Sequence, residues 1–216
     1  ESESDKKAVI VVTANRGLAG GYNSNITRMI IDEGFTKENT VVYAVGKKGR
    51  ELLERKGYEI KADYSEAIND PIYKDAKEIC DDVLSAFADG EVGEIYLAYT
   101  VFKNTVVHEP QLIRLLPVEA DDAAHETDGS EALMTYEPSE EEALDMIIPK
   151  YVCSLVYGAL IESVASENGA RMQAMDSATS NAEEMISTLS LKYNRARQAS
   201  ITQELTEIIA GANAIE

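Results

Sequence analysis

The sequence is poor in the residues that build metal, disulfide and membrane sites. It has two cysteines, two histidines and no tryptophan among 216 residues. Cys80 and Cys153 fit neither a CxxC nor a zinc spacing, so we expect two buried free thiols. His108 and His125 form no HExxH pattern, and neither a metal ion nor a cofactor is expected. The longest uninterrupted apolar run, residues 8–12, is far shorter than the ~18 residues that cross a bilayer, so no membrane insertion is expected.

Basic charge is also scarce. The chain has 20 Lys and Arg residues and 39 Asp and Glu residues, which gives a formal net charge of −19. This balance argues against binding to nucleic acid or to an anionic membrane through bulk charge, because both need clustered basic residues. Apolar residues make up 44% of the chain, enough for a core. The opening residues 1–7 contain neither an initiator Met nor an apolar targeting segment, which indicates a fragment of a longer protein.

Residues 1–118 alternate between strand-like and helix-like patterns. The β-branched run at residues 8–13 is typical of a strand buried on both faces. Strands alternating with helices imply right-handed βαβ units, so we predict an α/β domain with a mainly parallel sheet. The expected strands are 8–13, 40–45, 58–62 and 94–101, with an antiparallel pair at 105–108 and 112–116 closing the sheet. Three helices are expected: the first begins near residue 23, and the other two span residues 50–56 and 73–88.

Residues 119–149 differ in composition. They contain eleven acidic residues and no Lys or Arg, which is typical of a solvated loop. Within them, Ser139–Glu142 resembles a capping box that starts a short helix through Ile147. Pro149 is expected in the first turn of the next helix, where its missing N–H costs nothing.

Residues 150–216 predict one very long helix. At ~1.5 Å per residue, 63 helical residues span about 95 Å, whereas a domain of some 110 residues is only about 30 Å across. Apolar residues spaced three and four apart form a heptad seam that needs a partner outside the domain, or leads the chain to self-associate. The alternative is two shorter helices folded back at Gly169. The seam residues are Met172, Met175, Ala182, Ile186, Leu189 and Tyr193.

The glycine-rich loop Gly17–Gly21 follows a strand and precedes a helix, where α/β folds bind phosphate. Its spacing fits neither GxGxxG nor a P-loop, and no Lys or hydroxyl follows as a P-loop requires. A tight turn is the favoured interpretation, and a small phosphate- or nucleotide-binding enzyme that uses this loop with Arg16 is the alternative. No nucleophile and base stand in a known catalytic pattern, so no catalytic residue is expected.

Four segments together resemble a known family. Residues 193–209, YNRARQASITQELTEII, resemble almost residue for residue the C-terminal signature of the γ subunit of F-type ATP synthases. Residues 166–175 (SENGARMQAM), 16–23 (RGLAGGYN) and 136–138 (YEP) are similar to three further segments of that family. A free-standing coiled-coil adaptor would explain the long helix but not this C-terminal segment.

The resemblance implies a central rotor shaft, which couples proton flow through the membrane c-ring to ATP synthesis or hydrolysis on the β subunits. The coupling ion itself, proton or sodium, is set in the membrane ring. In the family, the C-terminal helix forms an antiparallel coiled coil with an N-terminal helix, inside a ring of α and β subunits. Here that N-terminal helix, expected before Glu1, is absent.

The resemblance also implies how the chain is divided and placed. Residues 1–118 form a Rossmann-like foot beside the ε subunit and the c-ring, residues 119–149 the acidic loop and short helix, and 150–216 the shaft helix. The chloroplast dithiol insert is absent, which favours a peripheral protein on the cytoplasmic face of a bacterial cell membrane. The matching residues are Arg197, Gln198, Thr202 and Glu204 for contact with β, and Tyr136 and Glu137 for contact with the c-ring.

Overall fold

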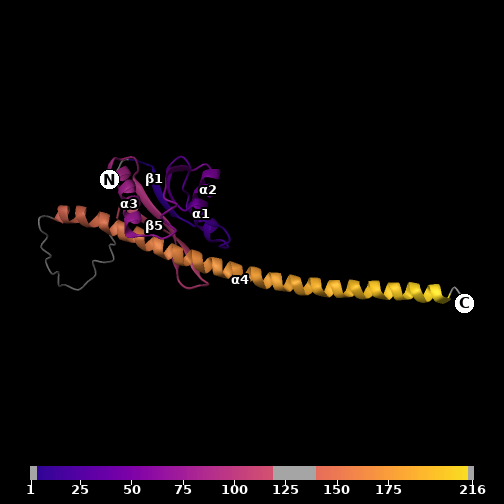
Figure 1. Ribbon diagram of the computed structural model, residues 1–216. Coiled ribbons are helices and arrows are strands. Elements are labelled where there is room, and N and C mark those ends of the chain that lie inside the picture. Colours follow the sequence, from indigo (N-terminus) through magenta and orange to yellow (C-terminus); the bar gives the residue numbers. More distant parts are fainter. Residues whose placement is uncertain (1–3, 119–139, 214–216) are drawn as a thin grey trace, which may run out of the picture. The chain divides into compact units, whose positions relative to one another are not determined.

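The computed structural model describes residues 4–118 and 140–213 (Figure 1). The chain divides into two compact units, Glu1–Gln173 and Ala174–Glu216, which are described separately below. The first unit contains the whole sheet, and the second contains the distal part of the last helix.

A five-stranded sheet forms the centre of the first unit, in the order β3-β2-β1-β4-β5. The first four strands are parallel and β5 runs antiparallel to β4, so the predicted mainly parallel sheet is confirmed. β1 and β2 are buried along almost their whole length, as the β-branched runs predict. The strands are β1 Lys7–Val12, β2 Thr40–Val45, β3 Glu59–Asp63, β4 Glu94–Phe102 and β5 His108–Leu116.

Helices cover both faces of the sheet (Figure 1). They are α1 Tyr22–Asp32, α2 Lys47–Arg55, α3 Tyr73–Ala88 and α4 Glu140–Asn213. Because side chains alternate along a strand, β1 contributes to two cores. Ala8, Ile10 and Val12 pack with α3 and the first part of α4, whereas Val9 and Val11 pack with α1 and α2. The result is a three-layer α/β/α arrangement within the first unit.

Of the predicted antiparallel pair at 105–108 and 112–116, the segment 112–116 is confirmed as part of the strand that closes the sheet, but residues 105–107 form no strand. Residues 103–106 turn the chain, and β5 is one strand that pairs with β4 throughout, from Phe102↔His108 to Ile95↔Leu116. The segment between the two expected strands contains Pro110, and proline is rare inside strands. Here it lies on an edge strand, where a missing N–H is tolerated.

The helix α4 is continuous from Glu140, so the expected boundary at Pro149 is wrong. The proline ring removes one backbone hydrogen bond, to the carbonyl of Asp145, but both residues are exposed and water can reach that carbonyl. The alternative break at Gly169 is also wrong, because α4 runs through this glycine without interruption. The remainder of the expected acidic loop lies outside the described residues.

Burial along α4 differs between the two units. In the first unit, Val152, Val156 and Leu160 are at most 2% exposed and pack on the sheet. In the second unit, every described side chain from Met175 to Gly211 is exposed. Within the first unit the sheet covers part of the helix, and within the second unit the helix has no buried face.

By length and composition, α4 also qualifies as a helix able to cross a membrane. Its most apolar 18 residues have a mean hydropathy of 1.5, and 28% of them are buried. One such helix is weak support for a span, because a core helix packed on a sheet meets the same criterion. The absence of membrane insertion therefore stays a prediction.

Thr13, directly after β1, ties the sheet to the start of α2. Its hydroxyl donates to the carbonyl of Gly46 at 3.3 Å and accepts from the N–H of Gly49 at 2.9 Å. The backbones approach so closely that a Cβ on Gly46 would lie 2.1 Å from the carbonyl oxygen of Thr13. Gly46 also has φ +115°, a conformation that favours glycine.

We therefore expect Gly46→Ala to lower the free energy of unfolding by about 2–4 kcal/mol, through backbone strain added to a steric clash. Urea unfolding followed by circular dichroism measures the change. Gly17→Ala is the matched control, because a Cβ there meets nothing within 4 Å, and its effect should stay within about 0.5 kcal/mol. Equal stability of the two variants would contradict this account of the turn.

Candidate functional site

The strongest candidate site is the exposed surface of α4 in the second unit. Large apolar side chains usually avoid water over so long a stretch, and a contiguous exposed patch of them marks an interaction surface. Several are at least half exposed, among them Met185, Ile186, Leu189, Leu191, Tyr193, Ile201, Leu205, Ile208 and Ile209. Forty helical residues without a buried face are only marginally stable in water, so this segment needs a partner.

The predicted seam residues of this unit lie along one face that turns slowly around the helix. Steps of three and four residues drift by about 20° per heptad on a straight α-helix. Met175, Ala182, Ile186, Leu189 and Tyr193 follow this pattern, and all of them are exposed. Met172 continues the same spacing at the end of the first unit, where it is also exposed. Coiled-coil pairing uses this kind of face.

The four predicted polar contact residues fall on two faces. Arg197 and Glu204 are one heptad apart and therefore share a face close to the seam. Gln198 and Thr202 are four residues apart and share the neighbouring face, where the Thr202 hydroxyl donates to the Gln198 carbonyl at 2.8 Å. The sequence analysis grouped these four residues as one contact set, whereas the helix places them on two faces, two residues on each.

The distal part of α4 carries three basic side chains that form no ion pair within the described part of the chain. Among the described residues, no ion pair involves Lys192, Arg195 or Arg197. Arg195 and Arg197 are two residues apart and so point to nearly opposite sides of the helix, about 200° apart. An exposed guanidinium is suited to paired hydrogen bonds with a partner's carboxylate. The other predicted contacts, Tyr136 and Glu137, lie outside the described residues.

The Gly17–Gly21 loop is a tight turn with unusual backbone conformations. Leu18 has φ +62° and Gly20 has φ +57°, and the Leu18 side chain is 76% exposed. Asn23 fixes the loop by accepting a hydrogen bond from the N–H of Ala14 at 2.9 Å. The sequence did not single out Leu18, because no pattern reveals a positive φ at leucine.

Phosphate binding at the neighbouring helix α2 is disfavoured by its own hydrogen bonds. The first-turn N–H groups of Lys47, Lys48 and Gly49 donate to Asn15 Oδ1, the Ala14 carbonyl and Thr13 Oγ1 at 2.9–3.0 Å. A phosphate at a helix N-terminus needs such N–H groups free. The N–H groups of the turn Gly46–Gly49 are therefore already hydrogen-bonded to residues 13–15 and are not free for a ligand.

A polar pocket of about 410 Å³ lies beside the glycine-rich loop. Arg16 and Arg171 line it, but so does Glu167, which forms an ion pair with Arg171 at 2.5 Å. Arg171 also approaches the carbonyl of Gly17 at 3.5 Å. The carboxylate and the ion pair reduce the positive potential that an anionic ligand would need.

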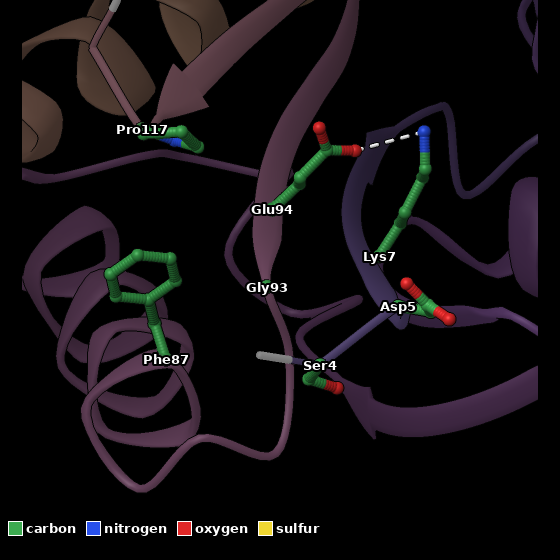
Figure 2. A pocket seen from close by; sticks show the side chains of 7 residues that line it. All are labelled: Ser4, Asp5, Lys7, Phe87, Gly93, Glu94 and Pro117. Carbon is green, nitrogen blue, oxygen red and sulfur yellow. Dashed lines mark ion pairs between the residues drawn. The ribbon is translucent and has the colours of Figure 1, made fainter. Parts of the chain in front are cut away.

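Figure 2 shows a second pocket, of about 440 Å³, near the amino ends of β1 and β4. Lys7 and Glu94 face each other there, with Nζ and Oε2 2.8 Å apart. The hydrogen bond from Lys7 holds the pKa of Glu94 below its ordinary value, and the same bond raises the pKa of Lys7. Both groups stay charged and paired near neutral pH, so the arrangement is structural and offers no general acid or base.

Cys80 and Cys153 are free and buried, as predicted. Both belong to the core between the sheet, α3 and α4. Burial raises the pKa of the Cys80 thiol well above its usual range, which disfavours the nucleophilic thiolate. Over residues 4–118 and 140–213 no group of three or more His, Cys, Asp and Glu side chains is arranged to hold a metal ion.

The sequence interpretation missed a polar cluster between α1, β4 and α4. The Tyr22 hydroxyl donates to the carbonyl of Ser163 at 3.1 Å, and the Ser166 hydroxyl donates to the carbonyl of Thr100 at 3.2 Å. A signal was present: two serines three residues apart interrupt the apolar face that α4 turns toward the sheet.

Comparison with known sequences identifies close relatives. The sequence model of the family described as ATP synthase matches residues 1–215. The ATP synthase gamma chain of Lachnoclostridium phytofermentans is 67% identical over 99% of this chain and 75% of that protein. The sodium ion specific ATP synthase gamma chain of Acetobacterium woodii is 42% identical over 100% of this chain and 76% of that protein.

Two solved structures share the fold. A chain of the mitochondrial ATP synthase of Euglena gracilis, in an OSCP/F1/c-ring assembly, superposes with a TM-score of 0.72 at 19% identity, over 99% of this chain and 74% of that chain. A chain of the central stalk and c-ring of the Tetrahymena thermophila enzyme gives 0.64 at 24% identity, over 83% and 79%. At these identities the likeness shows the fold alone.

The exposed seam leads to a prediction for the isolated chain. We expect it to self-associate through the 172–189 stripe or to lose helix there, because its apolar side chains have no cover. Light scattering should give a mass above 23.6 kDa at high concentration. Ile186→Lys with Leu189→Lys should restore a monomer with less helix in its circular dichroism spectrum.

Leu191→Lys is the matched control, since Leu191 is 59% exposed and Leu189 60%, but they point about 200° apart. Its association should stay near that of the unchanged chain. A compact monomer with full helicity over residues 172–189 would contradict the prediction.

Proposed function

The chain belongs to the ATP synthase γ-chain family, and from this we propose that it is the central rotor shaft of an F-type ATP synthase. The observation that carries the proposal is the 67% identity to a gamma chain over 99% of these residues. The long helix α4, whose distal apolar face is exposed, supports it, because a shaft needs such a face to meet its partners. The chain is thus a subunit of the membrane-associated F1 complex.

The proposed partners are the α and β subunits around the shaft, the ε subunit and the c-ring beside the sheet unit. We place the subunit at the cytoplasmic face of a bacterial cell membrane. The seam residues of α4 would pair with an N-terminal helix of the γ subunit. Tyr136 and Glu137 would meet the c-ring.

The mechanism follows from symmetry. Three chemically identical β subunits hold different nucleotide affinities only if something asymmetric contacts each of them differently. Turning the shaft passes each contact to the next subunit. Inverting a two-state site from 1:99 to 99:1 takes about 5.5 kcal/mol of differential binding. A few hydrogen bonds to charged groups, at about 1.5–3 kcal/mol each, supply that amount.

In this mechanism the chain itself needs no catalytic residue. It transmits torque, and nucleotide chemistry takes place on the β subunits. The self-bonded amides at the start of α2 and the Glu167–Arg171 ion pair support this division, since they reduce the affinity of the sheet unit for phosphate. A small phosphate-binding enzyme that uses Gly17–Gly21 is therefore the disfavoured alternative.

Reconstitution tests the proposal. The complete γ subunit carrying this sequence is mixed with α and β subunits, and steady-state ATP hydrolysis is measured. We expect sustained hydrolysis that depends on the chain, and rotation of a bead attached to the sheet unit. Failure to support hydrolysis would contradict the proposal, as would micromolar binding of ATP, NAD or a sugar phosphate in calorimetry that Arg16→Ala abolishes.

A second prediction concerns the proposed β contacts. Arg197→Ala should slow hydrolysis about 10-fold or more in the reconstituted complex, the cost of a lost hydrogen bond between charged groups. Gln198→Ala and Thr202→Ala, on the neighbouring face, should each cost less than about 10-fold. Arg195→Ala is the charge-matched comparison: Arg195 lies one heptad before Thr202, on that neighbouring face, so its loss should also cost less than about 10-fold. Equal effects at Arg195 and Arg197 would contradict a face-specific contact.

A further inference from the structure

Most of the contact between α4 and the sheet is apolar. Val152, Val156 and Leu160 are buried against β-strand side chains and α3. Apolar burial is strong but not directional, so it resists separation better than it resists rotation of a helix about its axis. A shaft under torque needs a second kind of contact.

Such a contact follows within the next turns of the same helix. The Ser166 hydroxyl donates to the carbonyl of Thr100 at 3.2 Å, and the Thr100 N–H approaches the Ser163 hydroxyl oxygen at 3.5 Å. Thr100 lies beyond the β1 ladder, which ends at Val11↔Ala98, and opposite Pro110, which has no N–H to donate. The two serines therefore supply partners where the sheet supplies few.

Tyr22 reaches the same segment from the other side. It is the first residue of α1, and its hydroxyl donates to the carbonyl of Ser163 at 3.1 Å. Burial raises the pKa of this hydroxyl, so it remains a protonated donor throughout the physiological range. Tyr22 is 5% exposed and both serines are fully buried. Breaking any of these bonds by rotation would leave buried polar groups unsatisfied.

One turn further along, the first residue of β5 approaches α4 at Gly169. A Cβ at this position would lie 2.7 Å from Cε1 of His108, so the imidazole packs directly on the helix backbone. Rotation of α4 by one residue position would place a side chain against His108. The steric stop and the hydrogen bonds act on the same short segment, 163–169.

We propose that Tyr22, Ser163 and Ser166, with the Thr100 backbone, form a clamp that fixes the rotational position of α4 against the sheet. Within the rotor-shaft function on which this inference rests, the clamp transmits torque between the sheet unit and the helix. Its members are positioning residues: they touch no nucleotide. Without the clamp, α4 would rotate relative to the sheet on its apolar contact, and part of the transmitted rotation would be lost.

The test uses inverted membrane vesicles that contain the assembled complex. ATP hydrolysis and ATP-driven ion uptake are measured on the same vesicles, and their ratio gives the ions moved per ATP. Tyr22→Phe combined with Ser166→Ala removes two directional bonds with little loss of apolar volume. Each lost hydrogen bond raises the equilibrium ratio of rotated α4 to clamped α4 about fivefold. We expect hydrolysis to persist while the ratio falls at least about twofold against an opposing gradient.

Two controls match the substitutions. Tyr58→Phe removes the hydroxyl of a tyrosine that is 7% exposed, against 5% for Tyr22; it donates to the Phe35 carbonyl at 2.7 Å on the far face of the sheet. Ser154→Ala removes a serine of the same helix whose hydroxyl bonds only to its own helix, at Lys150. Thermal unfolding of each variant chain shows whether the fold persists. The two controls should leave the ratio unchanged.

The outcomes separate the clamp from the function. An unchanged ratio in the double variant, with hydrolysis intact, overturns the clamp and leaves the rotor proposal standing. Absence of hydrolysis in vesicles with the unsubstituted chain overturns the rotor proposal and the clamp with it. Where the double variant does not assemble, Tyr22→Phe against Tyr58→Phe decides by the same ratio: a selective fall supports the clamp, and equal ratios overturn it.

Discussion

Apolar side chains leave water only where something covers them, and along α4 that cover is uneven. In the first unit the helix buries Val152, Val156 and Leu160 on a sheet that is itself buried on both faces. In the second unit Ile186 and Leu189 remain exposed. Since helices in proteins gain most of their stability from a packed apolar face, we expect the distal segment to depend on a partner. The family membership and the shaft function are consistent with this one constraint.

The sequence predicted the parts of the fold that depend on local patterns. β2 and α3 have the predicted bounds, and the crossover connections follow from alternating strands and helices. It failed where a local rule is overridden by context. Pro149 suggested a helix boundary, yet it lies in an exposed part of one continuous helix, where a missing N–H costs little. The last strand was divided in two, yet it is one edge strand that accommodates Pro110.

The candidate site shows the same division. Periodicity alone located the seam, because exposed residues on a single helix are placed by their spacing. The pairing of Arg197 with Glu204 follows from that geometry as well. The cluster of Tyr22, Ser163 and Thr100 does not, because its members are as far as 141 positions apart and only the tertiary fold brings them together. Long-range polar contacts are the part that one sequence cannot supply.

The three first-turn amides of α2 that bond to residues 13–15 have a wider consequence. In open α/β folds, such amides at a helix N-terminus are free to bind phosphate. Here oxygen atoms of residues 13–15 accept their hydrogen bonds. Any phosphate arriving at this edge would have to displace three hydrogen bonds. We therefore expect the first turn of α2 to keep one conformation whether ATP and ADP concentrations in the cell are high or low.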